Sequence, residues 1–282
     1  MRIAVTAGIS LLVAGLAACS SGGAAKPAKS VTASASQPAV SIGTVSLPDQ
    51  PGPLVDTIGR QVKTARTMHA DVQVASADGG TRLEQLSADV RTDLDSPMAA
   101  ITVHDGTQPT TYAVVTNGIV YSKTDGEEQE PGKPWAKLTR DDLPGLGDTA
   151  AGKLLKTILD QTDEALREVS GDTGLNLVRH GTFSGTATTE AVNGVQAHRY
   201  MGTTKTADMV SSDASYQQMV SAGLSKLSWT LWVDDRGLPA KFVVTLGTKD
   251  NKQAVHTASY TGWGKPVKIE IPAAGQVASV TG

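Results

Sequence analysis

The chain has 282 residues, a formal net charge of −3, and acidic and basic residues scattered along its length. It has no concentrated basic segment of the kind that nucleic-acid binding requires, which argues against DNA or RNA as a partner. Aromatic residues make up only 4% of the chain, so a core must be filled mostly by Val, Leu, Ile, Ala and Met.

The first 18 residues have the pattern of an export signal. Arg2 precedes an apolar run, and the small residues Ala17 and Ala18 precede Cys19, as secretory processing requires. A run of roughly 16 apolar residues is shorter than the ~20 that a membrane-spanning helix needs. We therefore interpret residues 1–18 as a signal peptide rather than a transmembrane helix.

Cys19 is the only cysteine of the chain, so no intramolecular disulfide can form. The segment that ends at Cys19 resembles the bacterial lipobox. That resemblance implies that the cysteine sulfur is acylated and that cleavage leaves Cys19 as the first residue, which anchors the protein on the extracytoplasmic face of the cell membrane. The alternative is an ordinary secretory signal with a chance cysteine.

Residues 19–53 are predicted to be the lipidated cysteine and a flexible tether. Residues 20–53 consist mainly of Ser, Ala, Gly, Pro, Thr, Val and Lys, with no aromatic residue and no sustained apolar periodicity. Such a segment cannot bury enough surface to offset the entropy of ordering it. As a flexible coil it would span about 30 Å.

Residues 54–272 are predicted to form one domain, followed by a tail over residues 273–282. An amphipathic helix is expected at 54–66, after which the apolar period changes from 3.6 to two. Tight-turn sequences at 78–80, 117–118, 235–237 and 249–251 separate several of the expected strands. The expected strands cover 68–74, 82–92, 98–104, 111–116, 119–123, 175–183, 196–202, 228–234, 239–247, 253–262 and 267–271.

Two further helices are expected on the C-terminal side of the first strands. The segment 135–138 leads into a helix in which Leu154, Leu155, Ile158, Leu159, Ala165 and Leu166 recur at helical spacing. A third helical segment covers about 206–224 and carries Met209, Val210, Tyr216, Met219 and Val220. Strands joined by short turns, with few helices between them, predict an α+β fold in which an antiparallel sheet is covered on one face by about three helices.

A sheet of about ten strands curls under its own twist. The space between its concave face and the helices is either a filled core or an apolar cavity, and composition leaves both possibilities open. If it is a cavity, the inward helix faces should line it. The candidate ligand-binding residues are Leu155, Ile158, Leu159, Met209, Val210 and Met219.

Three segments of the chain carry a family resemblance. Residues 193–202 (NGVQAHRYMG), 232–238 (WVDDRGL) and 260–267 (YTGWGKPV) are similar to strand and hairpin motifs of the LppX/LprG-type actinobacterial lipoproteins, which belong to the LolA-like fold group. The resemblance implies a half-open, strongly curved antiparallel barrel whose concave face is covered by helices. It also implies a cavity that takes up the acyl chains of a lipid or lipoglycan for transport in the cell envelope.

Enzymatic motifs are absent from the sequence. There is no G-x-S-x-G, S-x-x-K or H-E-x-x-H, and the five histidines are dispersed. The acidic pairs at 141–142 and 234–235 are typical of a helix start and a turn. We expect no catalytic residue, metal site or cofactor. The alternative to a lipid carrier is a membrane-tethered sensor or interaction module of the same fold that binds an envelope protein partner.

Overall fold

The computed structural model describes residues 39–76, 82–93, 97–104, 106, 108–212, 215–247 and 253–279. The predicted signal peptide, Cys19, the turns at 78–80 and 249–251 and the last three residues of the predicted tail lie outside this part of the chain. Among the described residues, no helix is both long and apolar enough to cross a membrane.

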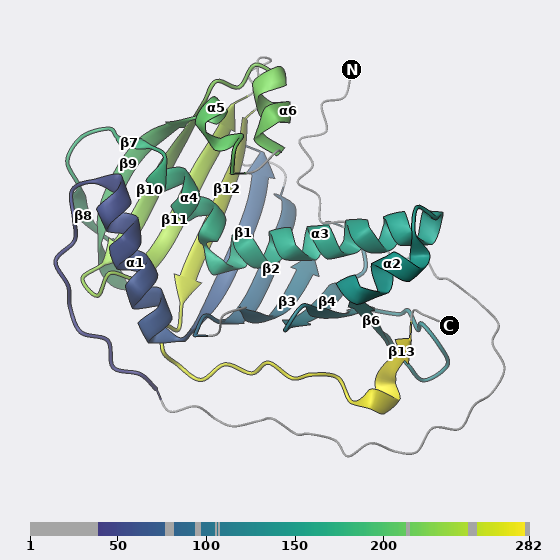
Figure 1. The fold of residues 1–282 in the computed structure, drawn as a ribbon. Coiled ribbons are helices and arrows are strands. Elements are labelled where there is room, and N and C mark those ends of the chain that lie inside the picture. Colours follow the sequence, from purple (N-terminus) through teal and green to yellow (C-terminus); the bar gives the residue numbers. More distant parts are fainter. Residues whose placement is uncertain are drawn as a thin grey trace.

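Thirteen described strands form one sheet that remains open, because β13 and β7 end the strand order β13-β6-β5-β4-β3-β2-β1-β12-β11-β10-β9-β7 (Figure 1). β8 pairs with β9, and the pairing of β1 with β12 joins the two halves of the chain. All pairings are antiparallel except that of β13 with β6. The bounds are β1 Thr67–Ser76, β2 Arg82–Arg91, β3 Met98–His104, β4 Thr111–Thr116, β5 Ile119–Thr124, β6 Trp135–Thr139, β7 Thr182–Phe183, β8 Thr188–Val192, β9 Val195–Lys205, β10 Lys226–Asp234, β11 Pro239–Gly247, β12 Gln253–Thr261 and β13 Val277–Ser279.

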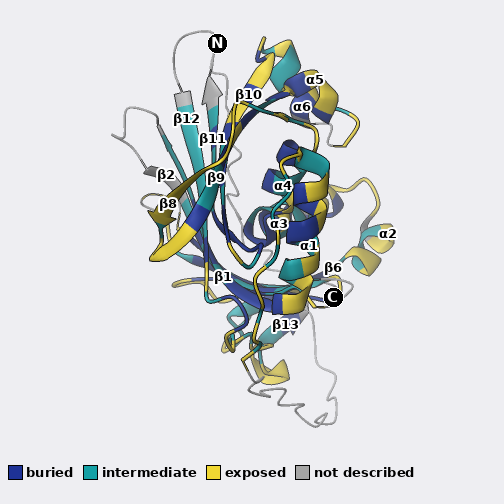
Figure 2. Cartoon of the chain, turned by 90° about the vertical axis from the view of Figure 1, so that its left-hand side faces the viewer, coloured by how far each residue is buried: buried dark blue, intermediate teal, exposed yellow. Residues whose placement is uncertain are grey.

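The sheet curves around α1, α3 and α4, which lie across its concave face (Figure 2). Thr149 caps the N-terminus of the long α3, because its side chain accepts a hydrogen bond from the Gly152 amide. Gly171, in the left-handed conformation, caps its C-terminus. The helices are α1 Pro51–Ala65, α2 Leu143–Leu146, α3 Ala150–Ser170, α4 Asp172–Arg179, α5 Thr206–Met209 and α6 Ser215–Ser221, with 3₁₀ turns at Arg140–Asp142 and Ala274–Gln276.

The predicted curved antiparallel sheet, covered on one face by helices, is confirmed. The strands expected at 98–104, 111–116 and 239–247 have the expected bounds. Asn117 and Gly118 both have positive φ, as the predicted β4–β5 turn requires. The two acidic pairs have the expected roles, since Asp142 caps a helix start at Thr139 and Asp234 lies at the β10–β11 turn.

The structure differs from the predicted secondary structure in five places. The strand expected at 175–183 is replaced by α4 and the two residues of β7, and residues 267–271 pair with no described strand. The segment expected to lead into the second helix is β6, and β8 was not expected. The third helix is divided into α5 and α6, so the described part of the chain has more than the three helices expected.

The folded domain extends beyond both predicted boundaries. Within the segment predicted as tether, the Val40 amide donates to the Gly264 carbonyl at 3.0 Å and the Val45 amide donates to the Asp235 carbonyl at 2.8 Å. Ile42 and Leu47 pack against the core. At the other end, Val277–Ser279 of the predicted tail forms β13. Residues 39–50 are therefore bound along the domain rather than free.

The β10–β11 turn depends on Asp234, which is only 6% exposed. Its carboxylate accepts from the Arg236 and Leu238 amides at 2.9 and 3.0 Å and from Arg236 Nε at 2.9 Å. Asp234→Ala is therefore expected to lower the free energy of unfolding by about 2–3 kcal/mol, since it leaves buried donors unpaired. Chemical denaturation measures this loss. Asp141→Ala, at an exposed position, should stay within about 0.5 kcal/mol, and equal losses in the two variants would contradict the role of Asp234.

Candidate functional site

The space between the concave face and the helices is largely a packed core. Leu155, Ile158, Leu159 and Met209 are each at most 5% exposed and belong to one continuous apolar cluster. Val210 and Met219 pack against that cluster. Of these six predicted cavity residues, Met219 is the one that lines either of the two pockets described below.

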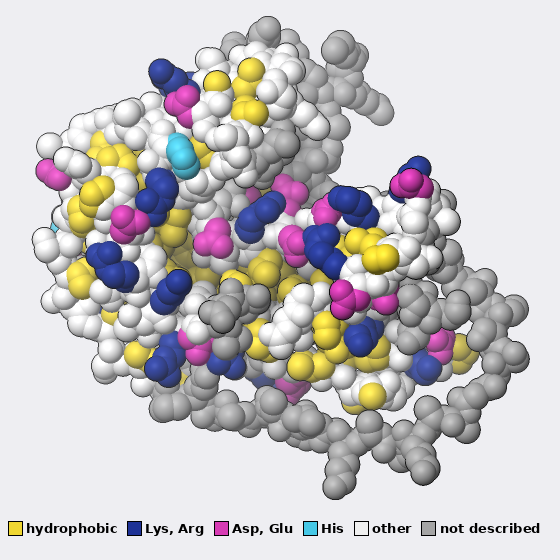
Figure 3. Space-filling model, viewed as in Figure 1, with side chains coloured by type: hydrophobic (Ala, Val, Ile, Leu, Met, Phe, Trp, Pro, Cys, Tyr) yellow, Lys and Arg dark blue, Asp and Glu magenta, His cyan; other side chains and the backbone are white. Residues whose placement is uncertain are grey.

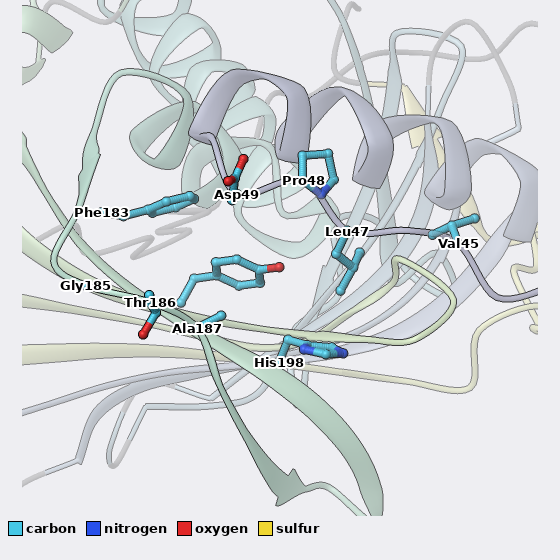
Figure 4. A pocket seen from close by; sticks show the side chains of 10 residues that line it. Val45, Leu47, Pro48, Asp49, Phe183, Gly185, Thr186, Ala187 and His198 are labelled. Carbon is cyan, nitrogen blue, oxygen red and sulfur yellow. The ribbon is translucent and has the colours of Figure 1, made fainter.

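The larger pocket lies where the chain enters α1, and we call it the α1 pocket. It has a volume of about 540 Å³, within the range of small-molecule sites. Three separate segments form its wall: the stretch before α1, the end of β7 with the loop to β8, and β9 (Figure 4). The lining residues are Val45, Leu47, Pro48, Asp49, Phe183, Gly185, Thr186, Ala187, His198 and Tyr200.

Aromatic side chains form the inner side of the α1 pocket. The Phe183 ring lies 5.3 Å from that of Tyr200 and 6.0 Å from that of Trp229, measured between centroids. Trp229 Nε1 donates to Thr204 Oγ1 at 2.9 Å, and Thr204 Oγ1 donates to the Leu177 carbonyl at 2.6 Å. This buried pair of hydrogen bonds ties β10 and β9 to α4 and fixes the Trp229 ring behind the pocket.

Four of the ten residues that line the α1 pocket carry polar side-chain groups, and one of them is acidic. Asp49 is exposed, and His198 Nε2 lies 2.9 Å from Asp235 Oδ1. Burial, and second the negative charge of Asp49, raise the pKa of the Tyr200 phenol, so that it remains a neutral hydroxyl. The pocket thus combines an apolar and aromatic wall with a small polar rim, an arrangement that suits an amphiphilic molecule.

A second, smaller pocket of about 110 Å³ lies between α3, α4, α6 and strands β10, β11 and β12, and we call it the α6 pocket. Its apolar wall includes Leu177, Met219 and Phe242, while Glu168 and His256 approach each other to 2.8 Å beside it. This volume is below the usual range for ligand sites. The interior beneath the helices is therefore closer to the filled-core alternative than to an open cavity.

Tyr260 in the α6 pocket gives a pH-dependent prediction. Burial, followed by the charges of Glu168 and Asp172, raises the pKa of its phenol far above the ordinary 10.0. Above pH 10 the unfolded chain loses this proton while the folded chain keeps it, so stability should fall by up to about 1.4 kcal/mol per pH unit. Tyr260→Phe removes this contribution. Denaturation of both proteins at pH 8 and pH 11 tests it, and equal losses for the two would contradict the assignment.

In the described part of the chain, no three side chains that could hold a metal ion gather, and the histidines other than His180 pair separately with acidic or hydroxyl groups. On the convex face, His69 lies 2.9 Å from Asp89 and 3.3 Å from the Ser87 hydroxyl. The His69 Nε2 atom also lies 3.5 Å from an Asp71 carboxylate oxygen, so Ser87 and Asp71 both approach this nitrogen.

The surface over the helices carries charges of both signs, interspersed rather than separated (Figure 3). This face therefore shows no basic patch of the kind that nucleic-acid binding requires. Several of the charges pair across elements, as Arg179 of α4 does with Asp56 of α1 at 2.6 Å.

Three solved structures are similar to this chain. LprF from Mycobacterium bovis has a TM-score of 0.47 and 20% identity, over 82% of this chain and 100% of that one. The lipoprotein LppX from Mycobacterium tuberculosis has a TM-score of 0.44 and 16% identity, over 77% and 98%. A LolA superfamily protein from Nitrosomonas europaea has a TM-score of 0.28 and 10% identity, over 77% and 94%.

These proteins carry the names of the groups that the sequence motifs resemble. At TM-scores below 0.5, the similarities do not by themselves assign a function to the chain. No family model and no curated protein sequence matches it.

Sequence reasoning missed the α1 pocket, because its wall comes from three segments that are distant along the chain. One signal was present in the region predicted as tether. The apolar residues Val40, Ile42, Val45 and Leu47 gather in its second half, just before the first helix. A free tether has no need for such a cluster, whereas a segment packed on a domain does.

Proposed function

We propose that this protein binds an acyl chain of a lipid in the α1 pocket and carries it within the cell envelope as a membrane-anchored lipoprotein. The observation that carries the proposal is the α1 pocket itself, a space of about 540 Å³ with an aromatic inner wall and a polar rim. An acyl chain placed there gains roughly 25 cal/mol for each Å² of apolar surface removed from water. Such a function requires binding and release and no catalytic group.

The predicted cavity residues remain part of the proposal for a larger ligand. Leu155, Ile158 and Leu159 on α3, with Met209, Val210 and Met219 near α5 and α6, form apolar packing that borders the concave sheet. A second acyl chain could bind here only if these residues separated from the sheet. The α6 pocket, lined in part by Met219, is the place where such an opening would begin.

The membrane anchor is proposed at Cys19, through acylation. Two acyl chains hold a protein durably on a bilayer, whereas one binds only marginally. Because residues 39–50 are bound to the domain, the free part of the tether would cover about 20 residues between Cys19 and residue 39. As a flexible coil these residues would span about 25 Å, which keeps the α1 pocket near the membrane surface.

Native mass spectrometry with solvent extraction tests the proposal. The chain should begin at residue 20, which removes the anchor and keeps every described residue, including the segment that binds Gly264 and Asp235. A lipid bound at near-stoichiometric occupancy, or taken up when added, is the expected result. A lipid-free protein that also takes up no added lipid would contradict the proposal and favour the sensor or interaction module.

A further inference from the structure

We infer that the α1 pocket discriminates against anionic lipid headgroups and takes an amphiphile whose polar end is uncharged and carries hydroxyl groups. This inference rests on the proposed function and specifies its ligand. Its basis is the charge of the pocket rim. None of the ten lining residues is Lys or Arg, and one of them, Asp49, is a carboxylate at an exposed position.

The groups next to the rim add negative rather than positive charge. His198 directs Nε2 to the Asp235 carboxylate at 2.9 Å, so this side chain already has an acidic partner. Arg236, in the same turn as Asp235, is held by Asp234 at 2.6 Å. A phosphate at the rim would meet carboxylates without a basic side chain to bind it.

The start of α1 does not compensate for this missing positive charge. A helix N-terminus usually attracts anions through its unpaired amides. Here Pro51 and Pro53 have no N–H, and the Leu54 amide already donates to the Gln50 carbonyl at 3.0 Å. Besides His198, the side-chain polar groups that line the pocket are the hydroxyls of Thr186 and Tyr200 and the Asp49 carboxylate, which bind hydroxyl groups well.

The test compares two lipids that differ only in a phosphate. Monooleoylglycerol and oleoyl-lysophosphatidic acid are titrated into the full chain carrying Cys19→Ala, below their micelle concentrations, by calorimetry. We expect the neutral lipid to bind at least about tenfold more tightly, because like charges at a binding site are repulsive. Equal affinities, or tighter binding of the phosphate, would overturn the inference and leave the proposed function standing. Binding of neither lipid would contradict both.

Two charge variants sharpen the result. Asp49→Lys should reduce the preference for the neutral lipid by roughly tenfold, since it converts the nearest carboxylate into a cation. Glu127→Lys makes the same change of charge at an exposed position in the β5–β6 loop, and should leave the preference unchanged. The inference fails if both variants alter the preference equally or if neither does. Thermal unfolding confirms that both variants are folded.

Discussion

Gly202→Val is expected to abolish stable folding of the domain. A Cβ atom at this position would lie 2.2 Å from Trp229 Cζ2 and 2.6 Å from the Thr182 carbonyl oxygen. The Trp229 ring cannot simply move away, since its Nε1 donates a hydrogen bond to Thr204 and its ring also packs edge-to-face with Phe183. Overpacking usually costs about 1–3 kcal/mol, and a clash that includes backbone on one side should cost more than 3 kcal/mol.

Denaturant unfolding and near-ultraviolet circular dichroism measure this loss. Gly59→Ala is the matched control, because nothing lies within 4 Å of its added Cβ and the residue is inside α1. That control should stabilise the protein by about 0.5–1 kcal/mol. A Gly202→Val protein as stable as the wild type would show that β9 and the Trp229 ring do not pack as described.

A double-mutant cycle separates the clash from other effects of the substitution. Gly202→Ala alone should be strongly destabilising, and Trp229→Leu alone should cost about 2–4 kcal/mol through lost packing and the lost hydrogen bond to the Thr204 hydroxyl. In the double variant the smaller leucine makes room for the new methyl group. The two losses should then sum to more than the loss of the double variant, by about 1 kcal/mol or more.

Ala187→Trp is expected to reduce lipid binding by at least tenfold without loss of stability. Ala187 is exposed and lines the α1 pocket, so an indole there occupies the space proposed for the acyl chain. Because the substitution adds a side chain on the surface, the free energy of unfolding should change by less than about 0.5 kcal/mol. Native mass spectrometry of bound lipid, with calorimetric titration of monooleoylglycerol, measures the effect.

The neighbouring Thr188→Trp is the control for Ala187→Trp. Thr188 is also exposed and begins β8, but it is not among the residues that line the α1 pocket. This variant adds the same indole to the same edge of the sheet and should bind lipid as the wild type does. If both variants bind normally, the acyl chain does not occupy the α1 pocket.

The sequence predicted the sheet well where local chemistry decides the structure. β4 and β5 are short runs rich in Val, Thr and Tyr, and Asn117 and Gly118 between them both adopt the positive φ of a tight turn. Such signals lie within about a dozen residues, so neither the rest of the chain nor the final packing is needed to interpret them. This part of the fold could therefore be predicted from the sequence.

The errors occur where distant contacts decide the structure. Residues 267–271 alternate perfectly, yet Pro266 and Pro272 flank them and the chain reaches the edge of β6 only at Val277. Most of α4 was predicted as a strand. Its helix packs through a close contact of Gly174 with Phe242, where a Cβ added to Gly174 would lie only 2.8 Å from the ring, and the local sequence does not reveal this distant contact. The α1 pocket was missed for the same reason, since no single segment contains it.

The path of residues 39–50 along the domain also sets the order in which its contacts would be loaded by a pulling force. The chain meets the Gly264 carbonyl at Val40 and the Asp235 carbonyl at Val45, and it then forms the pocket wall at Leu47, Pro48 and Asp49. A pull on the chain from its N-terminal side therefore acts first on the bond at Val40, then on the bond at Val45, and reaches the wall last. Two backbone hydrogen bonds in series thus shield the α1 pocket from tension in the preceding segment.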